Sequence, residues 1–272
     1  MLDRPDYLME SPEEEIRLEL KTDPQAVREQ AIWCGIKPGM KILHAGCGPG
    51  LVSSLLYELS QPGGFVMGVD YSQSRISYAR QHYERTDKIQ FQLCDLRELL
   101  PFGETFDLAW VRFVLEYNKS DLEIIVKNLD KALKPNGLLC LLDLDNNCLS
   151  HHPLPERLKV ALDRITEALE ERHGFDPYVG RKLYGLLYDL GYQNIQVAVR
   201  AHHLIYGKLR HQDFFNWMKK IEMIIRKEPS LVKAYLGGVN EFIKEFKEFF
   251  LNPRRFTYTP LIMCKGVKPS RA

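Results

Sequence analysis

The chain has 272 residues, 45% of them hydrophobic and 27% charged, which predicts a well-filled core in one large domain and excludes wholesale disorder. Its 37 Lys and Arg residues are balanced by 36 Asp and Glu residues, so no basic excess points to nucleic acid as an obligatory partner. No run of 18 uncharged apolar residues occurs, so the sequence predicts no membrane span.

The N-terminal segment is predicted to be a helical cap over residues 1–35. An acidic stretch over residues 3–19 argues against a secretory or mitochondrial leader. Thr22-Asp23-Pro24 is typical of a helix start, with a capping side chain before a first-turn proline, and the helix ends at Gly35. We expect Tyr7 and the acidic helix after it to fold over the bound ligand.

Beyond residue 40, strand and helix patterns alternate. The apolar runs that predict buried strands lie at residues 41–45, 65–69, 89–94, 106–111 and 137–143. The helical patterns that separate most of them lie at residues 51–60, 72–85, 120–133 and 154–172. This alternation predicts an α/β fold whose mostly parallel sheet carries helices on both faces.

The pattern changes after residue 175. The expected elements there are a helix over 178–190, a strand over Ile195–Arg200, helices over 211–227 and 230–250, and a strand over Phe256–Val267. We interpret residues 202–255 as a helical insertion between the last two strands that forms a lid over a second ligand. No Gly-, Ser- or Pro-rich linker divides the chain, so residues 1–272 are predicted to be one domain.

A glycine-rich turn follows the first predicted strand and is the most informative segment. Gly46 and Gly48 permit a sharp turn and a close approach of the backbone to a ligand, and Gly50 opens the next helix. A dinucleotide-binding turn requires G-x-G-x-x-G, but Leu51 occupies the last glycine position of that pattern. The shorter G-x-G-x-G favours a ligand that brings no phosphate to the turn, such as S-adenosylmethionine.

Two carboxylates at later strand ends support the same ligand. Asp70 closes the second apolar run, where it can accept hydrogen bonds from both hydroxyls of an unmodified ribose. Asp95 follows the third run, where it could meet an adenine amino group. A glycine turn alone is weak evidence, but the three strand ends together indicate a nucleoside-bearing cofactor.

With these motifs the chain resembles the class I S-adenosylmethionine-dependent methyltransferases, particularly the small-molecule branch with ubiquinone- and menaquinone-biosynthesis-type enzymes. The resembling segments, within residues 22–145, are Ala45–Gly50, Gly68–Ser72, Cys94–Leu96, Phe106–Glu116 and Leu133–Leu138. The resemblance implies a Rossmann-like, seven-stranded sheet, a cofactor-binding core over residues 36–145 and S-adenosylmethionine as cofactor. The predicted cofactor-binding residues are Gly46, Cys47, Gly48, Gly50, Asp70, Tyr71, Asp95, Leu96 and Arg112.

One position departs from the family pattern. Family members usually carry an acid two residues before the first glycine, where it helps to hold the ammonium group of the cofactor, and this chain has His44. A neutral imidazole could accept a hydrogen bond there, whereas a protonated one would repel the ammonium. We therefore expect weaker cofactor affinity with function retained.

Missing motifs point to a small-molecule acceptor. The segment Val111–Val114 occupies the place of the N/D-P-P-Y/F motif of amino-methylating enzymes, and the chain has no Pro-Cys dipeptide for cytosine C5 methylation. The acceptor, the methylated atom and the oligomeric state are left open.

General-base candidates should follow the fourth and fifth strands, where the ligand crevice lies. The preferred base is His151 or His152, and the alternative is a solvated histidine pair in the loop before the helix start at Pro153. Arg112 could contact the cofactor or an acidic acceptor, or equally lie as a surface guanidinium over the helix. Weaker pocket candidates are Tyr117, His202, His203 and Tyr206.

The function predicted is methyl transfer from S-adenosylmethionine to a small molecule by in-line displacement. The alternative is a non-catalytic S-adenosylmethionine-binding sensor or partner subunit. A nicotinamide-dependent oxidoreductase is disfavoured by Leu51.

The apolar stripe of the insertion, from Trp217 to Phe250, is either a core-facing surface or an apolar wall over the acceptor. Six cysteines without a C-x-x-C pair argue against a zinc site and favour reduced thiols in the cytoplasm.

Overall fold

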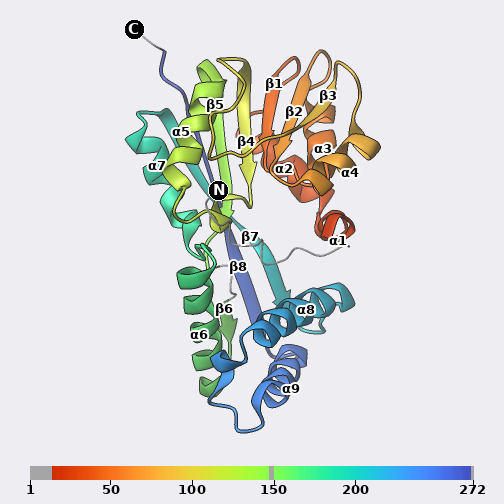
Figure 1. Ribbon diagram of the computed structural model, residues 1–272, viewed down its shortest axis with the longest axis vertical. Coiled ribbons are helices and arrows are strands. Elements are labelled where there is room, and N and C mark those ends of the chain that lie inside the picture. Colours follow the sequence, from red (N-terminus) through yellow and green to blue (C-terminus); the bar gives the residue numbers. More distant parts are fainter. Residues whose placement is uncertain (1–13, 147–149, 271–272) are drawn as a thin grey trace.

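The computed structural model describes residues 14–146 and 150–270, so Tyr7, Cys148 and most of the acidic N-terminal stretch lie outside the described residues. Its sheet has the strand order β3-β2-β1-β4-β5-β8-β6, and β7 pairs with β8 (Figure 1). The parallel strands are β1 (Lys41–Ala45), β2 (Phe65–Asp70), β3 (Ile89–Leu93), β4 (Phe106–Arg112) and β5 (Leu133–Leu144). The antiparallel strands are β6 (Ser150–His152), β7 (Gln193–Tyr206) and β8 (Phe256–Val267). The predicted open, mostly parallel α/β sheet is confirmed.

Helices cover both faces of the sheet because its parallel strands are apolar on both sides. On one face α2 (Pro24–Cys34), α3 (Leu51–Leu59) and α4 (Gln73–Tyr83) bury side chains against the strands. On the other face α5 (Leu122–Ala132) and α7 (Leu183–Asp189) do the same. The predicted start of α2 is confirmed, because Asp23 caps it by accepting the N–H groups of Gln25 and Ala26.

A second lobe lies beyond the sheet, at the lower end of the view in Figure 1. It contains α6 (Glu156–Arg172), α8 (His211–Lys227), the 3₁₀ turn η3 (Pro229–Val232) and α9 (Gly238–Leu251). Apolar side chains of these elements pack into one cluster, with Phe242, Phe246 and Phe250 almost completely buried. The stripe of the insertion is therefore a core surface, as one of its two interpretations predicted.

The elements differ from the predicted ones where tertiary pairing adds or divides structure. Instead of seven strands the sheet has eight, because residues 150–152 pair with the start of β8. The helix predicted over 230–250 is divided, because the 3₁₀ turn η3 ends at Val232 and α9 begins only at Gly238, whose φ is +64°. The helix predicted over 178–190 consists of the 3₁₀ turn η2 (Val179–Lys182) followed by α7. None of the helices in the described ranges is long and apolar enough to cross a membrane.

Candidate functional site

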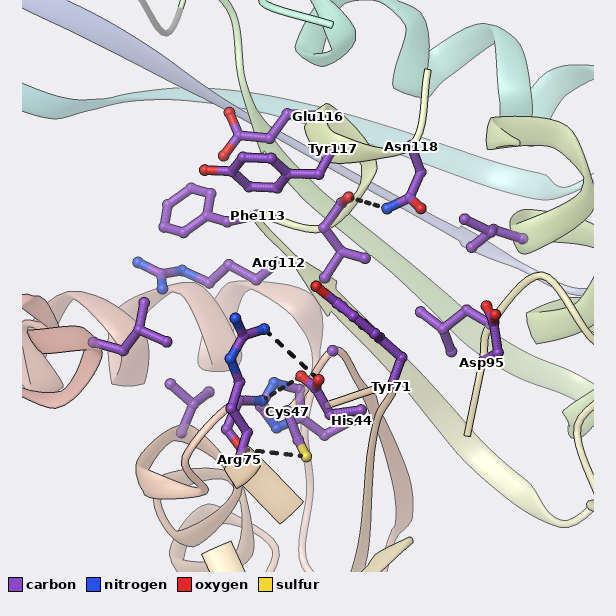
Figure 2. Close-up of a pocket in the computed structure, with 18 of the residues that line it drawn as sticks. His44, Cys47, Tyr71, Arg75, Asp95, Arg112, Phe113, Glu116, Tyr117 and Asn118 are labelled. Carbon is purple, nitrogen blue, oxygen red and sulfur yellow. Dashed lines mark hydrogen bonds and ion pairs between the residues drawn. The ribbon is translucent and has the colours of Figure 1, made fainter. Parts of the chain in front are cut away.

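A cavity of about 450 Å³ opens at the carboxyl ends of the parallel strands (Figure 2). Small-molecule sites usually occupy about 300–1,000 Å³ and lie at this edge of open α/β sheets. Of the predicted cofactor residues, those that line it are Gly46, Cys47, Gly48, Asp70, Tyr71, Asp95, Leu96 and Arg112. Gly50 does not line it, and neither do His151, His152, His202, His203 and Tyr206. The pattern of strand ends thus brings together eight of the nine predicted cofactor residues.

The glycine turn is held in its place by the end of β2. The N–H groups of Gly46 and Cys47 both donate to the carbonyl oxygen of Val69, at 2.8 and 2.9 Å. Gly46 has a φ of +68°, and a Cβ atom added to it would lie 2.2 Å from Cγ2 of Val114. Only glycine fits between this turn and the segment that follows β4.

Gly50 has a packing role that the sequence interpretation missed. Its φ is +102°, and an added Cβ would lie 2.8 Å from the ring of Tyr83 and 3.0 Å from Cβ of Ala79. Both neighbours belong to α4, so Gly50 lets the start of α3 pack closely against that helix. The prediction that Gly50 contacts the cofactor finds no support in this placement.

Asp70 is buried at the end of β2 and braces the glycine turn. One carboxylate oxygen accepts the Gly48 N–H at 3.0 Å, and the other accepts the Ser72 N–H at 2.9 Å. Arg75 Nη1 lies 3.8 Å away. Burial raises the pKa of Asp70, while Arg75 and the N–H groups of Ser72 and Gly48 oppose that shift. The carboxylate also lines the cavity, so it can act on a ligand from a fixed position.

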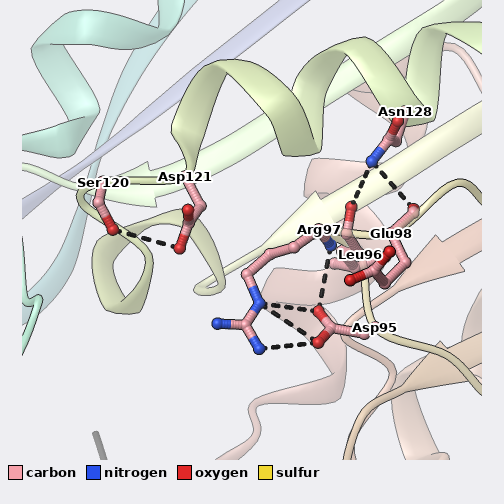
Figure 3. A network of polar contacts seen from close by, with 7 residues as sticks. All are labelled: Asp95, Leu96, Arg97, Glu98, Ser120, Asp121 and Asn128. Atoms are coloured by element: carbon pink, nitrogen blue, oxygen red, sulfur yellow. Dashed lines mark hydrogen bonds and ion pairs between the residues drawn. The ribbon is translucent and has the colours of Figure 1, made fainter. Parts of the chain in front are cut away.

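Asp95 belongs to a polar network at the end of β3 (Figure 3). The guanidinium of Arg97 pairs with its carboxylate, with the closest contact at 2.7 Å. Asn128 of α5 donates to the carbonyl oxygens of Leu96 and Glu98 and holds this loop against the helix. An adenine amino group at Asp95 would therefore share the carboxylate with Arg97, a partner that the sequence interpretation missed.

His44 is a neutral side chain in the floor of the cavity. Only 3% of it is exposed, and its Nδ1 lies 2.7 Å from the Oγ atom of Ser53. Burial, followed by the positive charge of Arg112, lowers the pKa of His44 to about 3. The repulsion expected of a protonated imidazole toward an ammonium group therefore does not arise at neutral pH.

Arg112 and Phe113 form the wall above the glycine turn at the end of β4. Arg112 Nε donates to Gln30 Oε1 at 2.9 Å, and its guanidinium lies 4.0 Å from the centre of the Phe113 ring. Burial lowers the pKa of Arg112 to about 10, so the side chain stays charged at neutral pH. Phe113 has a φ of +59°, a strained conformation for an aromatic residue that is typical of functional sites.

The η1 side of the cavity, named for the 3₁₀ turn η1 (Leu115–Tyr117), comprises Phe113, Glu116, Tyr117 and Phe175. Glu116 is 2% exposed, and the Tyr117 and Phe175 rings lie 5.6 Å apart. Figure 2 shows Glu116 and Tyr117 projecting from the same turn.

Asp143 of β5 fixes the turn that carries Glu116. Its carboxylate accepts the N–H groups of Leu115 and Glu116 at 2.9 and 3.2 Å. Burial, together with the negative charge of Glu116, raises the pKa of Asp143 well above its usual value. Glu116 was not singled out from the sequence, although an acid four residues after the fourth strand was a usable signal.

The two preferred base candidates lie on β6, beside the second lobe. His151 Nδ1 is 2.8 Å from Thr257 Oγ1, and its ring packs edge-on against Phe249. His152 is exposed on β6. The base prediction for them is not supported by this placement, because the pairing of β6 with β8 carries both away from the cavity. His202, on β7, lies behind Phe113 at a ring distance of 4.7 Å.

We predict that His151→Ala lowers the free energy of unfolding by about 1–3 kcal/mol, because a partly buried hydrogen bond and ring packing are lost. Burial, followed by the charge of Arg255, lowers the pKa of His151 to about 4. Its contribution is therefore complete above the unfolded pKa of 6.5 and is lost as the pH falls toward 4. Urea unfolding over this range tests both statements.

The control for this variant is His152→Ala, an exposed change that should stay within about 0.5 kcal/mol. Both variants should bind S-adenosylhomocysteine like the wild type. A loss of ligand binding or of turnover in His151→Ala without a loss of stability would contradict this prediction and would indicate that His151 acts in the functional site.

The helix α1 (Glu14–Lys21) closes the cavity from the N-terminal side. Leu18, Glu19 and Lys21 line the cavity. The Glu19 carboxylate accepts the Tyr83 hydroxyl at 2.6 Å and the Tyr78 hydroxyl at 3.2 Å, which anchors α1 to α4. No described residue of 202–255 lines the cavity, so the lid role expected of the insertion remains a prediction.

Comparisons with known proteins show that this chain is similar to methyltransferases. Residues 36–179 match the family described as "Methyltransferase domain". The chain is 36% identical over 110 residues to a ubiquinone biosynthesis O-methyltransferase of Bradyrhizobium diazoefficiens, covering 40% of this chain and 42% of that protein. It is 35% identical over 111 residues to an uncharacterized methyltransferase of Synechocystis, covering 40% of this chain and 49% of that protein. The chain thus spans less than half the length of these relatives.

Two solved structures share the fold. A putative methyltransferase from Bacillus halodurans superposes with a TM-score of 0.60 at 16% identity, covering 90% of this chain and all of that one. A phosphoethanolamine N-methyltransferase 2 of Haemonchus contortus in complex with S-adenosylmethionine superposes with a TM-score of 0.60 at 18% identity. That match covers 99% of this chain and 61% of the other. At these identities the likeness shows a common fold.

Proposed function

The chain belongs to the methyltransferase domain family, and on that premise we propose that it transfers a methyl group from S-adenosylmethionine to a small-molecule acceptor. One observation carries the proposal: the glycine turn, Asp70 and Asp95 lie at the ends of three adjoining parallel strands and line one cavity. The same cofactor is bound in the Haemonchus contortus structure that shares the fold.

We match the residues of the cavity to the parts of this cofactor in order. We assign Asp95, Leu96 and Tyr71 to the adenine and Asp70 to the ribose hydroxyls. The turn from Gly46 to Gly48 would admit the methionyl part, because its two glycines add no side-chain bulk. Arg112 would pair with the cofactor carboxylate, since it lies near His44 at the end of β1.

When bound, the cofactor supplies an electrophilic methyl group on a sulfonium. The chain itself would align the acceptor and exclude water, effects worth up to about 7–11 kcal/mol for well-placed reactants. The aromatic residues of the η1 side would hold the acceptor body. We assign Glu116 as the general base in place of His151 and His152, because it lines the cavity and could accept a proton from a hydroxyl or amine.

The deciding experiment has two readouts. Calorimetry should show binding of S-adenosylmethionine and S-adenosylhomocysteine, and incubation with a panel of small phenols, acids and amines should release S-adenosylhomocysteine. A non-catalytic sensor would bind the cofactor without release under any acceptor. Tighter binding of NADH than of S-adenosylmethionine would contradict the proposal altogether.

A substitution at His44 tests the assignment of the methionyl end. We predict that His44→Asp tightens S-adenosylmethionine binding about tenfold, because a carboxylate there can hold the ammonium group while Arg112 holds the carboxylate. The matched ligand is 5′-methylthioadenosine, which lacks the amino-acid group and should bind both proteins equally. Unchanged or weaker S-adenosylmethionine binding in the variant would contradict the assignment of the methionyl end to this part of the cavity.

The remaining assignments are broader. We propose residues 36–145 as the cofactor-binding core and 1–35 as the cap, because α1 lines the cavity that the core forms. We also propose a cytoplasmic setting, which is supported by the free thiols of Cys34, Cys47, Cys94, Cys140 and Cys264.

A further inference from the structure

Two cations line the cavity without an ion-pair partner in the described ranges, Lys21 at the end of α1 and Arg112 at the end of β4. The other buried guanidinium of the cavity, Arg75, faces the Asp70 carboxylate. Arg112 has at least the Gln30 amide and the Phe113 ring. Lys21 has no corresponding hydrogen bond to a described side chain, so its ammonium is the less satisfied of the two.

The surroundings of Lys21 concentrate positive charge. Burial, and after it the charges of Lys220 on α8 and Arg17 on α1, lower the pKa of Lys21 to about 7. Arg112 acts in the same direction, and Glu116 acts against it. On β7, the pKa values of His202 and His203 are lowered first by burial, and Lys21 and Lys220 contribute to both shifts. Both imidazoles are therefore neutral and bring no negative charge to Lys21.

The positions of the two cations divide the cavity. Arg112 follows Val111 of β4, which pairs with Ala45 of β1 directly before the glycine turn, whereas Lys21 ends α1. Lys21 feels the charge of Glu116, on the η1 side, as well as that of Arg112. By strand pairing Arg112 is the cation beside the glycine turn, where the methionyl end of the cofactor is assigned, and Lys21 remains for the acceptor.

We propose that Lys21 binds an anionic group of the methyl acceptor, which makes the acceptor a small organic acid whose apolar or aromatic body lies against Tyr117 and Phe175. The inference rests on the proposed function, because it takes the side of the cavity at the glycine turn, Asp70 and Asp95 (the turn side) as the cofactor site. An anion there would neutralise a desolvated ammonium among like charges, which favours binding. A neutral acceptor of the same shape would leave that charge uncompensated.

Benzoate and benzamide serve as probes, because they share an aromatic ring and differ in charge. Each is titrated into the complete chain saturated with S-adenosylhomocysteine, and binding is followed by calorimetry. Benzoate should bind about tenfold more tightly than benzamide, as expected for a hydrogen bond to a charged group. The preference should vanish in Lys21→Met and persist in Lys21→Arg.

The matched control is Lys220→Met, which removes a neighbouring cation that does not line the cavity. It should keep most of the benzoate preference, since only the long-range field changes. In the wild type, benzoate affinity should weaken as the pH rises past about 7, because the Lys21 ammonium then loses its proton.

Equal binding of the two probes, binding of neither, or a benzoate preference that survives Lys21→Met would overturn the inference. If Lys21 held the cofactor carboxylate instead, Lys21→Met would weaken S-adenosylhomocysteine but not 5′-methylthioadenosine, which also contradicts it. Wild-type binding of S-adenosylhomocysteine is measured first. Its absence would reject the proposed function, whereas its presence without benzoate discrimination would reject only the role of Lys21.

Discussion

Replacing Gly46 with alanine is expected to abolish measurable S-adenosylhomocysteine binding and to lower the free energy of unfolding by about 2–5 kcal/mol. Two causes add. The φ of +68° is unfavourable for any residue with a Cβ atom, and that Cβ would lie 2.2 Å from Cγ2 of Val114. To relieve the contact, the turn must move away from the segment after β4, and both of these line the cavity.

The two causes can be separated with variants of the same chain. Gly39→Ala is the matched control, because Gly39 has a φ of +82° but nothing within 4 Å of an added Cβ. It should cost about 1–2 kcal/mol from the backbone conformation alone and leave ligand binding intact.

A double-mutant cycle isolates the contact with Val114. In Gly46→Ala/Val114→Ala the clashing methyl group is gone, and only the Val114 Cβ remains, 3.5 Å from the added atom. The coupling energy should therefore be favourable, about 1–3 kcal/mol. Additive losses in urea unfolding would show that the clash is not what destabilises Gly46→Ala.

The turn side of the cavity was predictable because its signals are local. Gly46, Asp70 and Asp95 each follow an apolar run, and parallel strands bring their carboxyl ends to one edge of the sheet. The same reasoning did not predict the packing role of Gly50, since a positive φ can serve either a ligand or a neighbouring helix. Its neighbour is α4, and the sequence pattern carries no sign of that close approach.

The η1 side was less predictable because it depends on contacts between distant segments. Glu19 reaches Tyr78 and Tyr83 on α4, and this anchors α1 over the cavity with Lys21 at its end. His151 was a reasonable base candidate by position, but its strand pairs with the start of β8, more than 100 residues along the chain. Periodicity predicts that a segment is helix or strand, and it does not predict the surface against which that element packs.

Asp70→Asn is expected to weaken S-adenosylhomocysteine binding about 100-fold, a loss of about 2.7 kcal/mol. In the wild type each carboxylate oxygen accepts a backbone N–H, from Gly48 and from Ser72. An asparagine amide keeps one acceptor and turns its NH₂ group toward the other donor, so one of the two N–H groups loses its partner. The turn would lose its brace, and the proposed ribose contact would lose its charge.

The same variant should not be destabilised to a similar extent. Burial raises the pKa of Asp70 in the folded protein, so the folded state binds the proton more tightly than the unfolded state does. The ionised carboxylate therefore lowers stability above the raised pKa, and the deficit is relieved as the pH falls through that value. At neutral pH the uncharged amide of the variant escapes this penalty, which offsets the lost hydrogen bond.

Asp70→Asn should consequently weaken S-adenosylhomocysteine binding much more than it lowers the free energy of unfolding, as expected where a charge is kept buried for binding. Calorimetric titration with S-adenosylhomocysteine and urea unfolding of the same preparations measure the two quantities. The control is Asp107→Asn, which removes a partly exposed ion pair with Lys134 at the other end of β4 and should change neither much. A fall in unfolding free energy that accounts for all the lost affinity would mean that Asp70 only holds the fold, and the ribose assignment would fail.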